Sequence, residues 1–399
     1  MVRAAVLEPV HALVEAPKGV LMLRRSNARR PRPGIGWVLL ALLALVLFYL
    51  LQSGAGALLL DRAGSGLPDD QAGRQLQAFF TTPTLVYPDR PDRRGRAPLL
   101  EAALADLDRA RTSIDLATFD FDIAAVTDAL IRAQKRGVAV RVIIDSENLD
   151  TPEVAAQAGR LQAAGILVRF DRREPFMHDK FLVVDGAVVW TGSWNGTAND
   201  TFRNNNNMLR FASTTIAAAY TYEFDQMVHG RLGGSKHSTP RPERIPVGTA
   251  TVEVYFAPTD GVAEHILERL QAARASIRFL AFSYTSDAIA AQMVARAQDG
   301  LVVQGVFEAQ NADGSGSVFQ ALSGGGVDVL EDGNCYLMHH KVIVIDDRTV
   351  ITGSYNFTKS AERDNDENLV IVDDPTLARA YLDEFERVYT QAQSPTRCR

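Results

Sequence analysis

The feature that most constrains this chain is an internal repeat that carries a fixed set of polar residues. Residues 176–195 read FMHDKFLVVDGAVVWTGSWN, and residues 337–356 read LMHHKVIVIDDRTVITGSYN. In both segments His-x-Lys precedes four residues, an Asp, six residues and then Gly-Ser-x-Asn. A lone His-x-Lys on a strand is usually an ordinary surface feature, but two copies that agree at every one of these positions exclude a chance match. The fold must therefore place both copies in equivalent surroundings.

The repeat extends beyond these segments. Residues 108–121 match 271–284, and both are typical of the end of an amphipathic helix followed by a strand. Residues 128–145 match 291–308, as a second helix, a glycine stop and a second strand. The motif-bearing hairpin follows, and each half closes on a helix. This order predicts an α/β fold, namely a duplicated α/β sandwich with two pseudo-symmetric halves that share one site where they meet.

Composition and repeat together predict the domain boundaries. Residues 85–92 (LVYPDRPD) and 253–260 (EVYFAPTD) resemble each other and predict a short strand at the start of each half. Because Cys335 and Cys398 are the only cysteines, a disulfide-built scaffold and a multi-thiolate metal site are excluded. The predicted segments before the repeat are a basic cytoplasmic N-terminus (1–33), an apolar membrane or signal segment (34–60) and a spacer (61–83). The first half (84–230), a linker (231–250), the second half (251–392) and a tail (393–399) follow.

The apolar segment predicts a membrane location. Residues 37–51 read WVLLALLALVLFYLL, and about twenty apolar residues span a bilayer core as a helix. Five arginines within residues 24–32 precede this run, which favours a cytoplasmic N-terminus and a catalytic body outside the cytoplasm, in a single-pass cell-membrane protein. The alternative is a signal peptide cleaved at the small residues of SGAGA (53–57), which would leave the body secreted.

The charge of the chain is unevenly distributed. The net charge is −6, but residues 1–60 carry +5, so the remaining residues sum to −11. Neutralising the phosphates of a nucleic acid requires clustered Lys and Arg. An acidic body therefore argues against a large sequence-independent nucleic-acid surface.

The repeated residues together suit a phosphate diester. On a strand, residues i and i+2 share a face, so His178 points with Lys180, and His339 points with Lys341. The lysines supply positive charge for the phosphate, and one imidazole can attack phosphorus while the other donates a proton to the leaving oxygen. No carboxylate cluster of the kind that holds two divalent metals accompanies either motif, so we expect neither a metal nor a cofactor.

Over roughly residues 84–392 the chain resembles the phospholipase D superfamily, whose HKD motifs match both copies. The resemblance implies a metal-independent reaction in two steps, through a covalent phosphohistidine that water then hydrolyses. The family usually assigns the nucleophile to the first-half histidine. Carried over by position, the resemblance implies that His178 and His339 are the nucleophile/acid pair. It implies that phosphate is bound by Lys180, Lys341, Asn195 and Asn356, with support from Ser193 and Ser354.

The remaining candidates have supporting roles. We expect Asp185 and Asp346 to be structural residues of the hairpin turns, beside the motif glycines Gly192 and Gly353.

The two copies differ at one supporting position. Glu367 lies thirteen residues after Ser354, where the family commonly has a carboxylate that orients the motif histidine. The first copy has Asn206 there, and either Asn206 or the nearby Asp200 would support His178. Since an amide cannot stabilise an imidazolium as a carboxylate does, the two histidines should differ in pKa. In the alternative reading, Glu367 is a solvated charge at the end of a strand.

The sequence determines the chemistry better than the substrate. The leading hypothesis is hydrolysis of phospholipid head groups to phosphatidic acid at a phospholipid bilayer. A membrane-anchored or secreted endonuclease acting on DNA or RNA is the first alternative, and a cardiolipin synthase-like transferase is the second. A non-enzymatic scaffold is disfavoured because neither motif has lost its His, Lys or Asn. Since one chain carries both motifs, a monomer suffices and no obligate protein partner is expected.

Overall fold

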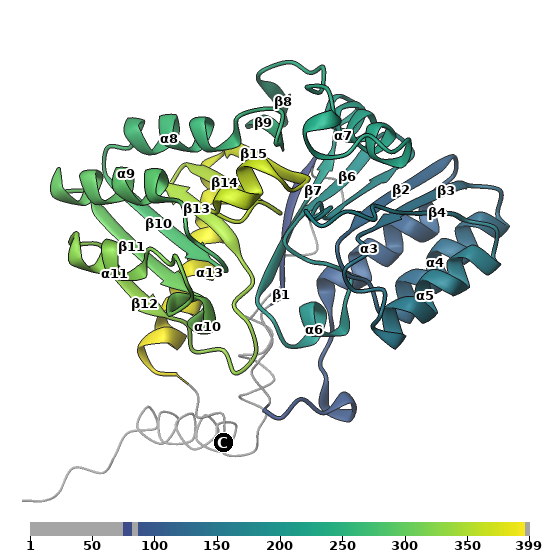
Figure 1. Ribbon diagram of the computed structural model, residues 1–399, viewed down its shortest axis with the longest axis horizontal. Coiled ribbons are helices and arrows are strands. Elements are labelled where there is room, and N and C mark those ends of the chain that lie inside the picture. Colours follow the sequence, from purple (N-terminus) through teal and green to yellow (C-terminus); the bar gives the residue numbers. More distant parts are fainter. Residues whose placement is uncertain (1–74, 82–86, 396–399) are drawn as a thin grey trace, which may run out of the picture. The chain divides into compact units, whose positions relative to one another are not determined.

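The computed structural model describes residues 75–81 and 87–395 (Figure 1). The chain divides into two units, Met1–Gly64 and Ser65–Arg399, and the described residues all belong to the second. The predicted cytoplasmic N-terminus and apolar segment lie outside the described residues and remain predictions. Within 75–81 and 87–395, no helix is both long and apolar enough to cross a bilayer.

The first half is a mixed sheet covered by helices, in the strand order β1-β7-β6-β5-β2-β3-β4. β2, β3 and β4 run parallel to one another, and the other neighbours are antiparallel. Its strands are β1 (Leu76–Thr81), β2 (Ser113–Thr118), β3 (Ala139–Ile144), β4 (Leu167–Phe170), β5 (Phe181–Val184), β6 (Val188–Gly192) and β7 (Asn206–Ala212). Its helices are η2 (Pro91–Arg93), α3 (Pro98–Arg109), α4 (Ala124–Lys135), α5 (Pro152–Ala163), α6 (Ala198–Phe202) and α7 (Thr214–Val228).

The second half repeats this arrangement, in the order β12-β11-β10-β13-β14-β15-β9-β8. Its strands are β8 (Ile245–Val247), β9 (Ala250–Ala257), β10 (Ser276–Ala281), β11 (Val302–Phe307), β12 (Asp328–Glu331), β13 (Lys341–Ile345), β14 (Thr349–Gly353) and β15 (Glu367–Asp373). Its helices are η3 (Gly233–Ser235), α8 (Val262–Ala272), α9 (Asp287–Gln298), α10 (Ala309–Ala312), α11 (Phe319–Gly324), α12 (Lys359–Arg363) and α13 (Pro375–Gln393). The predicted duplicated α/β architecture is confirmed.

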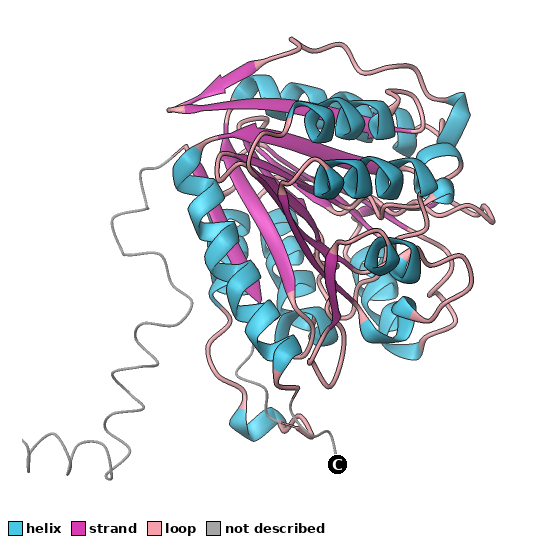
Figure 2. Cartoon of the chain, turned by 90° about the vertical axis from the view of Figure 1, so that its left-hand side faces the viewer, coloured by secondary structure: helices cyan, strands magenta, loops and turns pink. Residues whose placement is uncertain are grey.

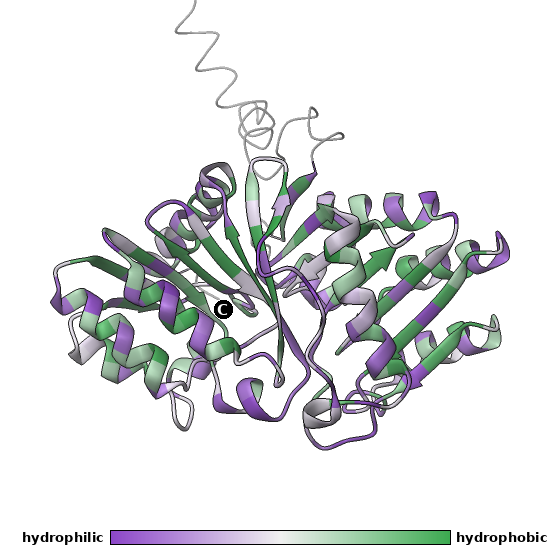
Figure 3. Cartoon of the chain, turned by 90° about the horizontal axis from the view of Figure 1, so that it is seen from above, coloured by the Kyte–Doolittle hydropathy of each residue, from purple (hydrophilic) through white to green (hydrophobic). Residues whose placement is uncertain are grey.

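The fold has three apolar cores, one within each half and one shared between them. Helices α3, α4 and α5 pack on the outer face of the first sheet, and α8, α9 and α11 pack on the outer face of the second. The inner faces of both sheets pack against α7 and α13, which form a shared central layer. Strands therefore lie between helical layers (Figure 2), and the strands are more apolar than the outward faces of the helices (Figure 3). This shared core fixes the position of one half relative to the other.

The motif-bearing hairpins have turns that match their sequences. Asp185 and Gly186 have φ values of 54° and 58°, and Asp346 and Asp347 have φ values of 52° and 51°. Two consecutive residues of positive φ are typical of the two-residue turns that follow the twist of a hairpin. The turns thus place His-x-Lys at the start of one strand and Gly-Ser-x-Asn at the end of the next.

Three predicted boundaries need correction. The predicted spacer 61–83 contains β1, which pairs with β7 in the sheet. The strand expected within 85–92 is not formed over 87–92, where η2 begins instead. The predicted linker 231–250 contains η3 and β8 and packs into the body, because β8 extends the second sheet through β9.

Candidate active site

Each motif histidine is held by the backbone of the opposite half. The backbone N–H of His178 donates to the carbonyl of Asp366 at 2.9 Å, and that of His339 donates to the carbonyl of Asn205 at 2.9 Å. Isolated parallel bridges, Met177 with Asp366 and Asn205 with Met338, flank these bonds. The two motifs therefore meet at the boundary between the halves, as the repeat predicts.

The ring of each histidine is also bound across the boundary. Nδ1 of His178 lies 2.8 Å from Oε2 of Glu367, and Nδ1 of His339 lies 2.8 Å from Oδ1 of Asn206. Oδ1 of Asp200 lies 3.7 Å from Nδ1 of His339. The expectation that Asn206 or Asp200 supports His178 is therefore wrong, because both face His339. The reason is topological: β7 and β15 begin next to the motif of the other half.

The two lysines are buried beside the histidines. Nζ of Lys180 donates to the carbonyl of His178 at 2.8 Å, and Nζ of Lys341 donates to that of His339 at 2.8 Å. Both side chains are 1% exposed. Burial lowers the pKa of Lys180 to about 8, against the opposing charges of Glu367 and Asp200, and it holds the pKa of Lys341 well below its usual 10.5. Buried ammonium groups with so little solvation suit an anionic ligand.

Burial also keeps the imidazoles neutral. The pKa of His178 lies well below 6.5 because of burial, then because of the charges on Lys180 and Lys341. The pKa of His339 lies well below 6.5 for the same reasons, although Asp200 acts in the opposite direction. Because each Nδ1 faces an accepting oxygen, the neutral rings carry their proton on Nδ1 and present an unprotonated Nε2.

The supporting carboxylates differ between the halves. Burial raises the pKa of Glu367 to about 8, and Lys180 opposes this shift. Burial acts to raise the pKa of Asp200, but the charge of His339 and hydrogen bonds from Asn204 and Asn195 hold it below 3.8. The ring of His178 is thus hydrogen-bonded to the carboxyl group of Glu367. The ring of His339 is hydrogen-bonded to the amide of Asn206, and the ionised carboxylate of Asp200 lies further away, at 3.7 Å.

The motif serines lie behind these supporting residues. The Ser193 hydroxyl donates to Oδ1 of Asn206 at 2.9 Å, and the Ser354 hydroxyl donates to Oε2 of Glu367 at 2.6 Å. Both serines are 0% exposed. This geometry orients the partners of the histidines, and a direct contact of either serine with phosphate stays a prediction.

The motif asparagine of the first half, Asn195, is also held by a neighbour. The backbone N–H and Nδ2 of Asn195 donate to Oδ2 of Asp200 at 2.9 and 2.8 Å. Within the described residues, Oδ1 of Asn195 and Oδ1 of Asn356 are buried without a hydrogen-bond partner. Asp200 therefore links the phosphate-binding candidate Asn195 to His339.

The motif glycines and turn aspartates shape the hairpins. A Cβ at Gly192 would lie 2.2 Å from the carbonyl oxygen of Asn207, and one at Gly353 would lie 2.2 Å from that of Asn368. The turn aspartates cap the strand before each hairpin: Asp185 accepts from the backbone of Arg111, Thr112 and Ser113, and Asp346 accepts from that of Arg274, Ala275 and Ser276.

Sequence reasoning missed two aromatic residues of the site. Phe119 lies with its ring 5.1 Å from the ring of His178 and 5.2 Å from Nζ of Lys180. Phe282 lies 4.6 Å from the ring of His339 and 4.6 Å from Nζ of Lys341. The repeat could have identified them, since Phe119 and Phe282 occupy matching positions of 108–121 and 271–284, each directly after the strand predicted there. Each ring lies within cation–π distance of the ammonium group of its lysine.

The described residues include no group of three or more His, Cys, Asp or Glu side chains placed to hold a metal ion.

Comparison with known proteins matches both halves. The family model described as "Cardiolipin synthase, PLD-like domain" matches residues 103–228 and 266–389. Mitochondrial cardiolipin hydrolase of Xenopus tropicalis is 40% identical over 119 residues, which are 30% of this chain and 56% of that protein. Phospholipase D of Rickettsia typhi is 28% identical over 166 residues, which are 41% of this chain and 81% of that protein. The chain thus spans 56–58% of the length of the cardiolipin hydrolases from the two Xenopus species.

Two solved structures are also similar. Nuc from Salmonella typhimurium, a phospholipase D family member, is 33% identical, with a TM-score of 0.34 over 36% of this chain and 95% of that one. Phosphatidylserine synthase from Haemophilus influenzae is 13% identical, with a TM-score of 0.60 over 80% of this chain and 86% of that one. The second likeness is one of fold alone.

Proposed function

The chain belongs to the phospholipase D superfamily, and on this premise we propose that it is a phosphodiesterase that hydrolyses phospholipid head groups to phosphatidic acid. The observation that carries the proposal is the exchange of supporting residues between the halves, in which Glu367 binds His178 and Asn206 binds His339. It gives the two imidazoles different partners, as a nucleophile and an acid require.

In the first step, His178 is the nucleophile. Its Nδ1–H donates to Glu367, so the lone pair of Nε2 attacks phosphorus. A phosphoimidazole carries positive charge, and the carboxyl group of Glu367 stabilises that charge by accepting the hydrogen bond from Nδ1–H. The bound phosphate anion and the carboxylate of Asp200 oppose the burial and the lysine charges that keep His339 neutral in the empty site. His339 in its protonated form then donates a proton to the departing oxygen of the head group, and the P–O bond breaks.

In the second step, water replaces the histidine. The neutral His339 accepts a proton from a water molecule as the water oxygen attacks phosphorus, and the P–N bond to His178 breaks. The phosphate leaves as phosphatidic acid, and His339 is protonated again for the next cycle. Asp200 supports this role because its ionised carboxylate lies 3.7 Å from Nδ1 of His339.

The lysines supply the charge that the phosphate requires. Lys180 and Lys341 are both nearly fully buried, and the charge of each acts on His178. A phosphate between them would replace lost hydration with two ion pairs, which strengthen as charge accumulates on the equatorial oxygens. This arrangement requires no metal ion for the proposed reaction.

The surroundings favour a lipid over a nucleic acid. The charge of Lys180 acts on Asp120 and the charge of Asp200 acts on Asp122, and burial raises the pKa of both carboxyl groups. Carboxylates beside the phosphate site do not suit a polyanion. In residues 75–81 and 87–395, the exposed large apolar side chains are dispersed over separate elements and form no continuous rim: Tyr87, Leu167, Tyr222 and Val302. The preference for lipid therefore rests on charge and on the names of the relatives.

The proposed location is at a membrane surface. An apolar segment at 34–60 would hold the body near its substrate. Cys335 is disulfide-bonded, which suits an oxidising compartment outside the cytoplasm. We therefore place the body outside the cytoplasm, either anchored or released by cleavage of the segment.

The test offers lipid and nucleic acid to the same preparation. The purified full-length chain is incubated with EDTA and with either phosphatidylcholine/cardiolipin vesicles or single-stranded DNA and RNA, and products are identified by mass spectrometry. We expect phosphatidic acid, and none with the His339→Asn control. Oligonucleotide fragments with intact lipid would overturn the lipid assignment in favour of a nuclease. Absence of product from all substrates would overturn the enzymatic assignment. Phosphatidylglycerol vesicles incubated in parallel would yield cardiolipin if the chain were a transferase.

A further inference from the structure

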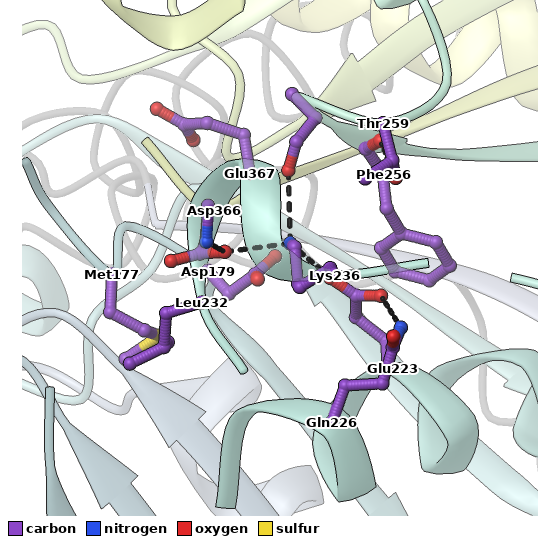
Figure 4. Close-up of polar contacts among 12 residues, drawn as sticks. Met177, Asp179, Glu223, Gln226, Leu232, Lys236, Phe256, Thr259, Asp366 and Glu367 are labelled. Atoms are coloured by element: carbon purple, nitrogen blue, oxygen red, sulfur yellow. Dashed lines mark hydrogen bonds and ion pairs between the residues drawn. The ribbon is translucent and has the colours of Figure 1, made fainter. Parts of the chain in front are cut away.

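The segment between the halves carries a buried charge that the proposed reaction does not use. Lys236 lies within the predicted linker 231–250, yet its side chain is 0% exposed. Figure 4 shows its ammonium group among carboxylates contributed by both halves. A lysine that is fully removed from water normally requires a specific set of partners.

Lys236 has three such partners. Nζ lies 2.7 Å from Oδ1 of Asp366 and donates to the carbonyl of Ala257 at 3.0 Å. It also donates to the carboxylate of Glu223, a residue of α7 in the central layer. These contacts raise the pKa of Lys236 despite its burial, so the ammonium stays charged. The linker therefore connects α7 to the start of β15.

Asp366 also binds the backbone on either side of Met177, and so connects Lys236 to the proposed nucleophile, His178. Its backbone N–H donates to the carbonyl of Phe176 at 2.9 Å, and its carbonyl accepts from the N–H of His178 at 2.9 Å. The next residue, Glu367, binds the ring of His178. One dipeptide thus fixes both the backbone and the ring of His178, and the Asp366 side chain determines where that dipeptide lies.

The carboxylate of Asp366 is held from several directions. Its Oδ1 also accepts from the backbone N–H of Gly233 at 2.7 Å, and its Oδ2 accepts from Arg173. Asp179, the middle residue of the first His-x-Lys, faces the same group of charges, and burial raises its pKa to about 8. Two cations, Lys236 and Arg173, thus balance Asp366 and Glu223.

The other half achieves the same clamp without charge. Asn205 takes the place of Asp366: its N–H donates to Leu337 and its carbonyl accepts from His339, both at 2.9 Å. The side chain of Asn205 accepts from Nδ2 of Asn334 at 2.6 Å, an amide contact. The ionic cluster is therefore specific to the side of His178.

We propose that Lys236 is a positioning residue for His178, acting from the linker through Asp366. The assignment of His178 as the reacting group rests on the proposed function, but the placement of its ring does not. Removing the ammonium leaves Asp366 and Glu223 buried without their shared cation, and a shift of Asp366 moves both anchors of His178. His339 has no contact with this cluster and serves as an internal reference.

The experiment uses the full-length Lys236→Met variant and reads the two histidines separately. In protein labelled with ¹⁵N-histidine, the Nδ1–H resonances are assigned with His178→Asn and His339→Asn. We expect the signal of His178 to shift and that of His339 to stay in place. This readout needs no turnover, so it remains valid even if the chain hydrolyses no diester. Equal shifts of both signals, or no shift, would overturn the proposal.

Kinetics with bis(p-nitrophenyl) phosphate provide the second readout. Misplacement of an attacking atom lowers kcat more than it raises KM, and we expect kcat to fall roughly 10- to 100-fold with KM nearly unchanged. The matched control is Lys359→Met, which removes an exposed lysine paired with Asp287 at 2.8 Å and should leave kcat unchanged. A parental kcat in the Lys236→Met variant would contradict the proposal.

A double variant separates positioning from a loss of folding. Lys236→Met with Asp366→Asn removes one charge of each sign and reproduces the neutral clamp of Asn205. We expect this variant to fold, to return the His178 resonance toward its original position and to recover most of kcat. If it folds but leaves the His178 signal displaced, the role of Lys236 is structural and the proposal is wrong. If the single variant Lys236→Met does not fold, the His178 resonance of the folded double variant alone decides the proposal in this way.

Discussion

Glu367 in the second half lies 2.8 Å from the imidazole of His178 in the first. The two residues are 189 positions apart in sequence. Neither half alone therefore contains both the proposed nucleophile and the carboxyl group that binds it. The shared central layer of α7 and α13 supplies the rigidity that this pairing needs, because it packs against both sheets.

Replacing Glu367 tests the most specific feature of this pair. Glu367→Gln retains an accepting oxygen for Nδ1–H but loses the carboxyl group that stabilises the phosphoimidazole. We expect kcat for phosphatidylcholine to fall by roughly 10²- to 10⁴-fold, the range for groups that support a catalytic base. Stability should change little, because burial raises the pKa of Glu367 to about 8 and a mostly neutral carboxyl group is exchanged for a neutral amide of similar size. Rapid-quench trapping of phosphoenzyme should show a slower formation, and an unchanged rate would contradict the role of Glu367.

Asp200 should affect the leaving group rather than the attack. It is the ionised carboxylate near His339, and its counterpart in the second half is Ala361. Asp200→Asn weakens the imidazolium that protonates the leaving oxygen. We expect a loss of roughly tenfold or more with an alkoxide leaving group such as choline, and little loss with p-nitrophenolate, which needs no proton.

A compensating change provides the control for Asp200. Asn206→Asp places a carboxylate of the same size directly on Nδ1 of His339, so it should restore lipid hydrolysis in the Asp200→Asn background. Equal losses with both leaving groups, without restoration, would show that Asp200 only holds Asn195 in place.

The motif glycines test the packing of the hairpins. Gly192→Ala forces a Cβ to within 2.2 Å of the carbonyl oxygen of Asn207, a backbone atom that cannot move freely. We expect a loss of about 1–3 kcal/mol in the free energy of unfolding, measured by urea denaturation. Gly159→Ala on the exposed side of α5 is the matched control, because no atom lies within 4 Å of the added Cβ. It should stabilise by about 0.5–1 kcal/mol, and equal effects would contradict the steric account.

The sequence predicted the reacting groups because their spacing is local. His178 and Lys180 lie two positions apart, directly before β5, and the repeat alone implies that His339 and Lys341 join them. It could not predict which supporting residue binds which histidine. Spacing within one half says nothing about contacts across the boundary, and Asn206 and Glu367 both cross it.

The segments misassigned from composition depend on distant partners. β1 pairs with β7, about 130 residues away along the chain, and its LQAFFT sequence has no clear alternation of polar and apolar residues. Lys236 lies in GRLGGSKHSTPRP, a composition typical of a linker. Its burial follows only from the positions of Glu223 and Asp366, which come together in the folded chain.

kcat/KM should fall as the pH becomes mildly basic. A phosphodiester is an anion, so binding requires protonated lysines, and burial lowers the pKa of Lys180 from 10.5 to about 8. The charge of Lys180 is therefore lost as the pH rises through 8, and that of Lys341, whose pKa burial also lowers, is lost before the pH reaches the usual 10.5. The neutral His178 required for attack persists well below pH 6.5. With bis(p-nitrophenyl) phosphate, whose leaving group needs no proton from His339, we expect activity to hold on the acidic side past that value and to decline at about pH 8.

Lys180→Arg identifies the group behind the basic decline. A guanidinium stays protonated throughout the measurable range, so this variant should lose absolute activity but should move the decline of kcat/KM to higher pH. The profile is measured with bis(p-nitrophenyl) phosphate, whose leaving group does not depend on His339. An unmoved decline would assign it to Lys341 or to Glu367, whose pKa burial raises to about 8. Lys341→Arg then separates the two, because it removes the titration of Lys341 and leaves that of Glu367 in place.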